Sequence, residues 1–441
     1  MTDTVAGPAL QDMLSQWLPR QRWFPGRGIA ISDLSIVSDV PLLSGDPQLH
    51  HLIIEVVLAT GPARFQVLVG TRTQPGAAAG DSLICTLPGL VVYDALHDPE
   101  LAAQLVRGIA QKRTAGPLRF VSEAGAPLAD LSHGKLLTGE QSNTSLVFGN
   151  TAILKVLRRL FPGANPDLEV ADALARLGSD RVAAPYGWIE TEIGGEPVLL
   201  AVLSEYLAGA QDGWTLATEG LRSGRGEAFV GEAHRLGLAT AQLHSQMATA
   251  FGSREMTSAE LAAFIGNLHS KLTAAVAIMP ELGVHAGRIA AAYSALSQLN
   301  RPVMIQRVHG DYHLGQVMRS QHGWVALDFE GEPAAPLAER RAMTPALRDV
   351  AGMLRSFDYA ARHQLVGHPE RRDFAAVAGA WVAQCQDAFC SGYAEGGGAD
   401  PSDQATLLHA LTLEKAVYEV IYEYRHRPTW LSIPLDFVAA A

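Results

Sequence analysis

The strongest constraint on this chain is one polar loop between two short apolar, strand-like runs. The loop reads VHGDYHLGQ over 308–316 and carries Asp311 and Gln316. The second run reads WVALDFE over 324–330 and ends at Asp328. Phosphoryl transfer needs a carboxylate that orients an incoming hydroxyl and accepts its proton, and oxygen ligands for the Mg²⁺ that neutralises phosphate charge. This spacing of two carboxylates and an amide can meet both needs, and it therefore indicates a phosphotransferase.

Two other interpretations of this segment are open. In the first, His309 and Asp311 form only a capped turn, and Asp328 caps the next element. In the second, these residues and His313 hold a catalytic zinc ion for hydrolysis, because His309 and His313 have the spacing of a helical zinc pair. Gly310 and the flanking strand pattern disfavour a helix here, so the phosphotransferase interpretation is preferred.

The rest of the chain divides into a β-rich first half and an α-rich second half. Alternating apolar residues and turn signals predict strands at 52–59, 63–69, 119–122, 145–148, 152–157, 188–191 and 197–206. Helical patterns are predicted at 10–18, 99–111, 226–250, 258–279, 283–299, 346–364, 372–394 and 402–425. The sequence thus predicts an α+β architecture.

A lysine and a glutamate of the β-rich half are suited to binding a nucleotide. Lys155 lies in the strand AILKVL, where an inward-pointing ammonium without a partner would be costly. Glu169 is the nearest good counter-charge, at the start of a helix that Asn165 is expected to cap. Such a Lys–Glu pair fixes a lysine on nucleotide phosphates in kinases. The alternative is that Lys155 faces solvent on an edge strand.

Two further segments of this half could contact a nucleotide. The turn EQSNTS over 140–145 precedes a strand and takes the place of a glycine-rich loop, although no P-loop or dinucleotide-binding glycine motif occurs. Its candidate phosphate-binding residues are Ser142, Asn143, Thr144 and Ser145. The run LSEYL over 203–207 contains Glu205 and Tyr206, and its backbone could bind an adenine edge as kinase hinges do.

The composition limits the partners and the compartment. With 48% apolar and 18% charged residues, the chain can bury a sizeable core. Its net charge of −11 disfavours non-specific binding to nucleic acid or to an anionic membrane. The three cysteines, Cys85, Cys385 and Cys390, form no paired framework, and no signal peptide is visible. A cytoplasmic location is expected.

The chain resembles the aminoglycoside-phosphotransferase and choline-kinase branch of the eukaryotic-like protein kinase fold. The resemblance lies in the order of its motifs: Lys155, Glu169, a hinge, an HGD loop and then Asp-Phe-Glu. The likeness is tighter to the bacterial maltokinase family. The motifs that carry it are QRWF (21–24), EQSNTS (140–145), VHGDYHLGQ (308–316), DFEGEP (328–333), LRDVAGMLRSF (347–357) and RPTW (427–430). Gln316 and Glu330 replace the usual kinase Asn and Gly in a maltokinase-like way.

The resemblance implies a bilobal protein-kinase-like fold with an N-terminal cap. The implied divisions are a cap subdomain at 1–89, a β-rich N-lobe at 90–207 and a helical C-lobe at 208–441. The implied reaction is ATP- and Mg²⁺-dependent transfer of the γ-phosphoryl group to the anomeric hydroxyl of maltose. Its product, maltose 1-phosphate, feeds α-glucan (glycogen) synthesis. A monomer that binds a small sugar, without nucleic-acid or membrane partners, is expected.

The resemblance also implies individual roles. Asp311 is the general base, and Gln316 and Asp328 are the metal ligands. Lys155 binds the phosphates and pairs with Glu169. Independently of these roles, Arg348 and Asp349 are expected to open a helix and brace the catalytic loop. The cluster of Arg20, Arg22 and Trp23 is expected to anchor the cap, and the alternative is that it forms a ligand site.

Residues near the C-terminus could hold the sugar, because sugars stack on planar faces and pair their hydroxyls with charged groups. The candidate substrate contacts are Asp311, Glu330, Tyr422, Arg425, Arg427 and Trp430. Tyr418, Tyr422 and Arg425 fall at helical steps and share one face. The alternative is that the two tyrosines are core and Trp430 is a packing anchor. Two other functions are also open, a glucosamine kinase and a catalytically silent kinase-like binding module.

Overall fold

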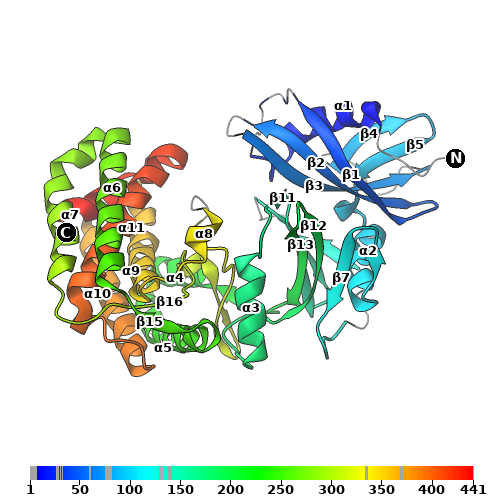
Figure 1. Cartoon of the computed structure of the whole chain (residues 1–441). Helices are drawn as coiled ribbons and strands as arrows, with labels where there is room; N and C mark the ends of the chain where they lie inside the picture. Colours follow the sequence, from blue (N-terminus) through cyan, green and yellow to red (C-terminus); the bar gives the residue numbers. More distant parts are fainter. Residues whose placement is uncertain are drawn as a thin grey trace. The chain divides into compact units, whose positions relative to one another are not determined.

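The computed structural model describes residues 7–25, 29, 31, 33–58, 61–74, 82–128, 131, 133–137, 142–332, 336–367 and 372–440. They form two compact units (Figure 1). One unit contains Met1–Asp172 and Ala183–Ala208, and the other contains Ala173–Val182 and Gly209–Ala441. Three residues of the motifs above, Glu140, Gln141 and Pro333, lie outside the described residues.

The first unit begins with an antiparallel sheet in the order β1-β2-β3-β5-β4, with β11 also paired to β3. Its strands are β1 (Leu34–Leu43), β2 (Gln48–Leu58), β3 (Gly61–Arg72), β4 (Leu83–Leu87), β5 (Leu90–Asp94) and β11 (Arg159–Leu160). Helix α1 (Pro8–Trp17) covers one face of this sheet (Figure 1), where Leu14 and Trp17 are buried with Phe65. Trp23 packs against the same core, with its ring centroid 6.3 Å from that of Phe65, so the anchoring role predicted for this residue is confirmed.

A second antiparallel sheet completes the first unit, in the order β6-β7-β12-β13-β10-β9-β8. Its strands are β6 (Thr114–Ala115), β7 (Leu118–Ser122), β8 (Gly134–Leu136), β9 (Thr144–Phe148), β10 (Ala152–Val156), β12 (Pro185–Ile193) and β13 (Glu196–Glu205). Helix α2 (Pro99–Ala110) contributes Leu105 and Ile109 to a core that also contains Leu68 of β3 and Leu200 of β13. The two sheets and α2 therefore share one hydrophobic core.

Local sequence signals explain the elements around Lys155. Gly149 and Asn150 make the turn between β9 and β10, which pair antiparallel. Strand β10 also pairs with β13, so the edge-strand alternative for Lys155 is wrong. Helix α3 (Pro166–Arg176) begins where Asn165 Oδ1 accepts a hydrogen bond from the Leu168 N–H at 3.1 Å, which confirms the predicted cap.

The second unit is mainly helical, as predicted. Its helices are α4 (Gly213–Arg222), α5 (Gly226–Phe251), α6 (Ser258–Ile278), α7 (Gly283–Ala295), α8 (Leu337–Arg340), α9 (Leu347–Arg362), α10 (Arg372–Glu395), α11 (Ala405–His426) and α12 (Ser432–Ala440). Helix α9 is central: it packs against α4, α10, α11 and α12, and all residues from Asp349 to Ala361 are buried.

Short strands frame the polar loop of the second unit. Strands β14 (Gln211–Asp212), β17 (Val317–Ser320) and β18 (Gly323–Ala326) form one small sheet. Strands β15 (Ser253–Glu255) and β16 (Met304–Gln306) form another. The strand–loop–strand pattern predicted around Asp311 is therefore present, with the loop running from β16 to β17.

The β-rich first half and helical second half confirm the predicted α+β fold class. One helix in the described part of the chain, α6, is long and apolar enough to cross a membrane by length and composition alone. A single helix of this kind is weak evidence for a membrane protein.

Candidate active site

The loop between β16 and β17 holds Asp311 in a defined conformation. Gly310 has a φ of +87°, which favours glycine and turns the chain directly before Asp311. The Nε2–H of buried His309 donates to the Leu327 carbonyl at 2.8 Å, and its Nδ1 accepts from the Asp311 N–H at 3.4 Å. These bonds fit a ring that carries its proton on Nε2. They also occupy both ring nitrogens, which argues against the zinc alternative.

Asp349, in the first turn of α9, fastens this loop to the helical core. Its carboxylate accepts hydrogen bonds from the N–H groups of His309 at 2.8 Å and Gly310 at 2.9 Å. It also accepts one from His244 Nε2 of α5 at 2.9 Å. Burial raises the pKa of Asp349, but the His244 hydrogen bond and charge outweigh burial and leave the pKa below its usual value. The predicted bracing role of Asp349 is confirmed.

The Asp311 side chain is paired with a lysine that the sequence analysis did not identify. Lys415 Nζ of α11 lies 3.0 Å from Asp311 Oδ1. Burial raises the pKa of Asp311, but the charge and the hydrogen bond of Lys415 outweigh burial and hold the pKa below its usual value. For His313, burial dominates and lowers the pKa to about 4, so this ring is neutral at neutral pH. The sequence did contain a signal for this lysine: Lys415 precedes Tyr418 by three residues, so both lie on the helix face considered for sugar binding.

Gln316 and Asp328 lie together, where β17 begins and β18 has ended. The Gln316 Nε2–H donates to Asp328 Oδ2 at 3.3 Å, and carboxylate oxygens of Asp328 and Glu330 lie within 4.8 Å of each other. Asp328 has a φ of +63°, which is uncommon for a non-glycine residue and typical of functional sites. Carboxylate and amide oxygens are the donors that Mg²⁺ prefers, so these residues fit that ion once the Gln316 amide turns its oxygen inward.

A cavity of about 440 Å³ opens beside Asp311 within the second unit. Three of the predicted sugar contacts, Tyr422, Arg427 and Trp430, line it together with Asp311. Trp214 of α4, which the sequence analysis did not identify, stacks on Trp430 with ring centroids 6.2 Å apart and an angle of 20°. Glu330 and the exposed Arg425 are not among the residues lining this cavity, and their contact with a sugar stays a prediction.

Each of the three carboxylates that line this cavity has a cationic partner. Asp311 pairs with Lys415, Glu419 with Arg355 at 2.8 Å, and Glu423 with Arg427 at 2.7 Å. The Arg427 guanidinium also lies over the Trp430 ring, 4.6 Å from its centroid. The cavity therefore combines aromatic faces with carboxylates that are each held in an ion pair, a lining that suits a polar ligand with several hydroxyl groups.

The first unit contains the predicted nucleotide-binding residues. Lys155 Nζ lies 3.6 Å from Asp167 Oδ2, a carboxylate in the first turn of α3 that the sequence analysis did not name as its partner. The predicted pairing of Lys155 with Glu169 stays a prediction. Glu205 ends β13, and the Tyr206 N–H donates to the Thr151 carbonyl at 2.9 Å, so this segment is held against the β9–β10 turn.

The predicted phosphate-binding turn is partly buried. Ser142 is exposed and Asn143 half-buried, whereas Thr144 and Ser145 are buried in β9. Arg158 Nε donates to Thr144 Oγ1 at 2.8 Å, and the Arg158 guanidinium also pairs with Asp94 and lies over the Trp23 ring. This buried arginine connects the first sheet to the strand that follows the turn. The phosphate-binding role of the four turn residues stays a prediction.

Comparison with known proteins places these features in a family. Residues 17–98 match the maltokinase N-terminal cap domain. A glucosamine kinase from Streptacidiphilus jiangxiensis is 34% identical over 349 residues, which cover 76% of this chain and 79% of that protein. A glucosamine kinase from Mycolicibacterium smegmatis is 29% identical over 315 residues, covering 68% of this chain and 77% of that protein.

A solved structure extends the similarity to the whole chain. A glucosamine kinase in complex with glucosamine, ADP and inorganic phosphate has a TM-score of 0.70 and 27% identity, and the alignment covers 100% of both chains. The predicted kinase-like fold is confirmed by this match. The chain therefore belongs to the maltokinase-like family of kinase-fold sugar kinases.

Proposed function

We propose that the chain is an ATP- and Mg²⁺-dependent maltokinase, which transfers the γ-phosphoryl group of ATP to the anomeric hydroxyl of maltose and forms maltose 1-phosphate. The observation that carries this proposal is the cavity beside Asp311, whose aromatic side chains and paired carboxylates suit a neutral sugar. Its volume of about 440 Å³ lies in the usual range of small-molecule sites. The match to the maltokinase cap domain supports the same assignment.

In the proposed reaction the sugar hydroxyl donates a hydrogen bond to Asp311, which accepts its proton as the new bond to phosphorus forms. The bond between the γ-phosphorus and the bridging oxygen breaks, and ADP leaves with the electron pair. Because Lys415 keeps the pKa of Asp311 low, the carboxylate is ionised and ready to accept this proton at neutral pH. The Asp349 bonds keep the loop in place during the transfer.

The proposed nucleotide contacts come from the first unit. Lys155 would hold the phosphates, with Glu169 as its partner, and the turn from Ser142 to Ser145 would donate hydrogen bonds to them. The backbone of Glu205 and Tyr206 would bind the adenine edge. Gln316 and Asp328 would hold Mg²⁺, which neutralises charge on the phosphates. The ADP in the similar glucosamine kinase structure supports a nucleotide as the phosphate source.

A second candidate is a glucosamine kinase, because both relatives compared above carry that name. Glucosamine is a cation at neutral pH, and a site for it would gain from a carboxylate without a cationic partner. The three carboxylates that line the cavity are all paired with Lys415, Arg355 or Arg427. Because each of these carboxylates already has a cationic partner, the lining favours maltose over the aminosugar.

An acceptor panel tests the assignment. ADP release would be measured with maltose, glucose, glucosamine and kanamycin, and the position of the new phosphate would be determined by NMR. Maltose should give the highest kcat/KM, with phosphate on the anomeric oxygen. A higher kcat/KM for glucosamine would replace the maltokinase assignment with the second candidate. ATP consumption without any phosphorylated sugar would contradict both.

A further inference from the structure

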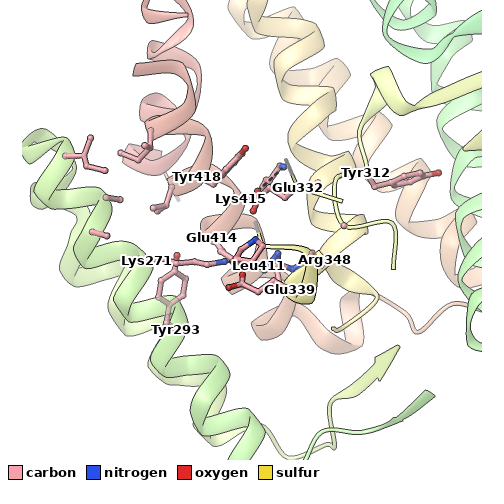
Figure 2. Close-up of a pocket in the computed structure, with 18 residues that line it drawn as sticks. Lys271, Tyr293, Tyr312, Glu332, Glu339, Arg348, Leu411, Glu414, Lys415 and Tyr418 are labelled. Atoms are coloured by element: carbon pink, nitrogen blue, oxygen red, sulfur yellow. Dashed lines mark hydrogen bonds and ion pairs between the residues drawn. The ribbon is translucent and has the colours of Figure 1, made fainter. Parts of the chain in front are cut away.

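Two cavities of the second unit meet at one lysine. The cavity beside Asp311 and a neighbouring cavity of about 370 Å³ share Gly352, Lys415 and Tyr418 in their linings. Figure 2 shows the neighbouring cavity, with Lys415 and Glu332 close together above the ion pairs of Glu414. The Lys415 ammonium thus lies in the wall between the two spaces and not on the outer surface.

The position of this ammonium is well defined. Lys415 Nζ lies 3.0 Å from Asp311 Oδ1, 3.9 Å from Glu332 Oε1 and 4.9 Å from the centroid of the Tyr418 ring. Its side chain is only 19% exposed. Burial lowers the pKa of Lys415, but the charges of Asp311, Glu332 and Glu419 outweigh burial and raise it. The lysine is therefore charged at neutral pH, in contact with the carboxylate that faces the acceptor.

The residue before Lys415, Glu414, links helix α11 to two neighbouring helices. Glu414 accepts hydrogen bonds from Lys271 of α6 at 2.9 Å and from Arg348 of α9 at 2.7 Å (Figure 2). Asp349, the neighbour of Arg348, holds the backbone of the Asp311 loop. The ammonium and the carboxylate are therefore attached to the same helix, α9, through adjacent residues. Their contact is preorganised and does not depend on a flexible surface lysine.

We propose that Lys415 is a positioning and specificity-determining residue: it keeps the Asp311 carboxylate turned toward the acceptor cavity and disfavours acceptors that bring a positive charge beside the reacting hydroxyl. This inference rests on the proposed function, because it takes Asp311 as the group that receives the acceptor proton. It deepens that function by naming the substrate class, uncharged sugars.

Both effects follow from the same geometry. An acceptor hydroxyl bound to Asp311 lies next to the Lys415 ammonium, where an acceptor ammonium would meet a like charge in a partly desolvated site. A neutral hydroxyl at the same place meets no such repulsion. The titratable and charged groups around Asp311 are Lys415 and Tyr418 of α11, His309 and His313 of its own loop, Glu332, and Asp349 of α9. Among these, Lys415 makes the shortest charged contact with the carboxylate.

Two variants of the full-length protein separate charge from packing. Lys415→Met keeps an unbranched side chain and removes the charge, whereas Lys415→Arg keeps the charge. With a neutral sugar, Lys415→Met should lower kcat about tenfold to a hundredfold and leave the KM for ATP within about twofold. The acidic limb of the kcat/KM profile should move to higher pH, because the group that lowers the Asp311 pKa is gone. Lys415→Arg should return that limb toward the wild-type position.

Selectivity is measured on a matched pair of sugars. Glucosamine carries an ammonium group where glucose carries a hydroxyl, and the two sugars are otherwise the same. The dissociation constant of each sugar is measured by calorimetry for the wild type and for each variant. The ratio of glucosamine affinity to glucose affinity should rise about tenfold or more in Lys415→Met and stay at the wild-type value in Lys415→Arg. An unchanged ratio together with an unmoved acidic limb in Lys415→Met would overturn the proposal.

The failure of the proposed function has a different signature. If the wild-type protein phosphorylates no sugar of the panel, the function is wrong, and a crystal structure of Lys415→Met still decides the positioning role. An Asp311 carboxylate rotated away from the cavity would support it, and an unmoved carboxylate would refute it. If Lys415→Met does not fold, Lys415→Gln takes its place, and thermal melting of each variant is measured first.

Discussion

Asp349 accepts a hydrogen bond from the backbone N–H of Gly310, the residue that turns the chain into the candidate base. A buried carboxylate of α9 thereby sets the position of a loop distant in sequence. The same carboxylate binds His244 of α5, so two helices and one loop meet on a single side chain. Because both oxygens are engaged, removing the charge affects both the stability and the geometry of the site.

The first prediction concerns this carboxylate. Asp349→Asn should lower the free energy of unfolding by about 1.5–3 kcal/mol, because an amide cannot accept on both atoms. It should also lower kcat while the KM for ATP stays close to the wild-type value. Denaturant unfolding and steady-state kinetics measure the two effects. Asp403→Asn is the matched control, since Asp403 pairs with Arg301 on the surface and both side chains are exposed. A loss equal to that of the control would contradict the prediction.

The same variant has a pH signature with a defined sign. The folded-state pKa of Asp349 lies below its usual value. Its stabilisation is therefore fully present above the unfolded-state pKa of about 3.9 and is lost as the pH falls through the lower folded-state pKa. The stability gap between wild type and Asp349→Asn should be largest at neutral pH and should close below about pH 4. Unfolding titrations from pH 7 to pH 3 measure this gap, and a gap that widens toward acid would rule out the assignment.

The second prediction concerns a close approach beneath the loop. A Cβ on Gly352 of α9 would lie 2.6 Å from the carbonyl oxygen of Tyr312, the residue after Asp311. Gly352→Ala should therefore displace the loop, cost about 1–3 kcal/mol of stability and lower kcat. Gly379→Ala in α10 is the matched control, because nothing lies within 4 Å of a Cβ there. That control should be neutral or slightly stabilising, and equal behaviour of the two variants would argue against the steric explanation.

Much of the candidate site could be predicted from the sequence because local patterns encode it. The loop with Asp311, Gln316 and Asp328 lies within one strand–loop–strand segment, so order and spacing were sufficient. Lys415 was missed because it reaches Asp311 from α11, and no local pattern specifies that contact. Asp167 was missed as the Lys155 partner for a similar reason. Asp167 and Glu169 lie in the same helix turn, and only the packing of α3 decides which of them approaches Lys155.

The third prediction tests the aromatic wall of the acceptor cavity. Trp430 stacks on Trp214 and carries the Arg427 guanidinium over its ring. Trp430→Ala should raise the KM for the sugar about tenfold, equivalent to about 1.4 kcal/mol, and leave the KM for ATP unchanged. Tyr424→Ala serves as control, because Tyr424 is 48% exposed on α11 and does not line the cavity. An unchanged sugar KM in Trp430→Ala would return this residue to the packing role considered above.

As with the site, some elements of the fold could be predicted from neighbouring residues in the sequence, and others could not. The neighbouring strands at 145–148 and 152–157 and the helix cap at Asn165 follow from short-range chemistry, and all of them were predicted. Strand β1 and helix α4 were not, because the packing that stabilises them is non-local. In β1, Val40 and Leu42 belong to the core that the two sheets share. The N-cap of α4, Asp212, lies in β14, which pairs with the distant β17.

The last prediction concerns the buried arginine of the first unit. Arg158 and Asp94 form an ion pair in which both side chains are 1% exposed, and Arg158 also binds Thr144. Arg158→Met leaves the Asp94 carboxylate buried without this partner and should cost about 3–5 kcal/mol, measured by denaturant unfolding of the full chain. Arg64→Met is the control: the Arg64–Glu55 pair is more than a third exposed, and the loss should be about 1 kcal/mol or less.

Adding Asp94→Asn to Arg158→Met should recover part of the loss, because the buried charge disappears with its partner. If the double variant lost the sum of both single effects, the two residues would be energetically independent, and Arg158 would stabilise the unit through Trp23 and Thr144 alone.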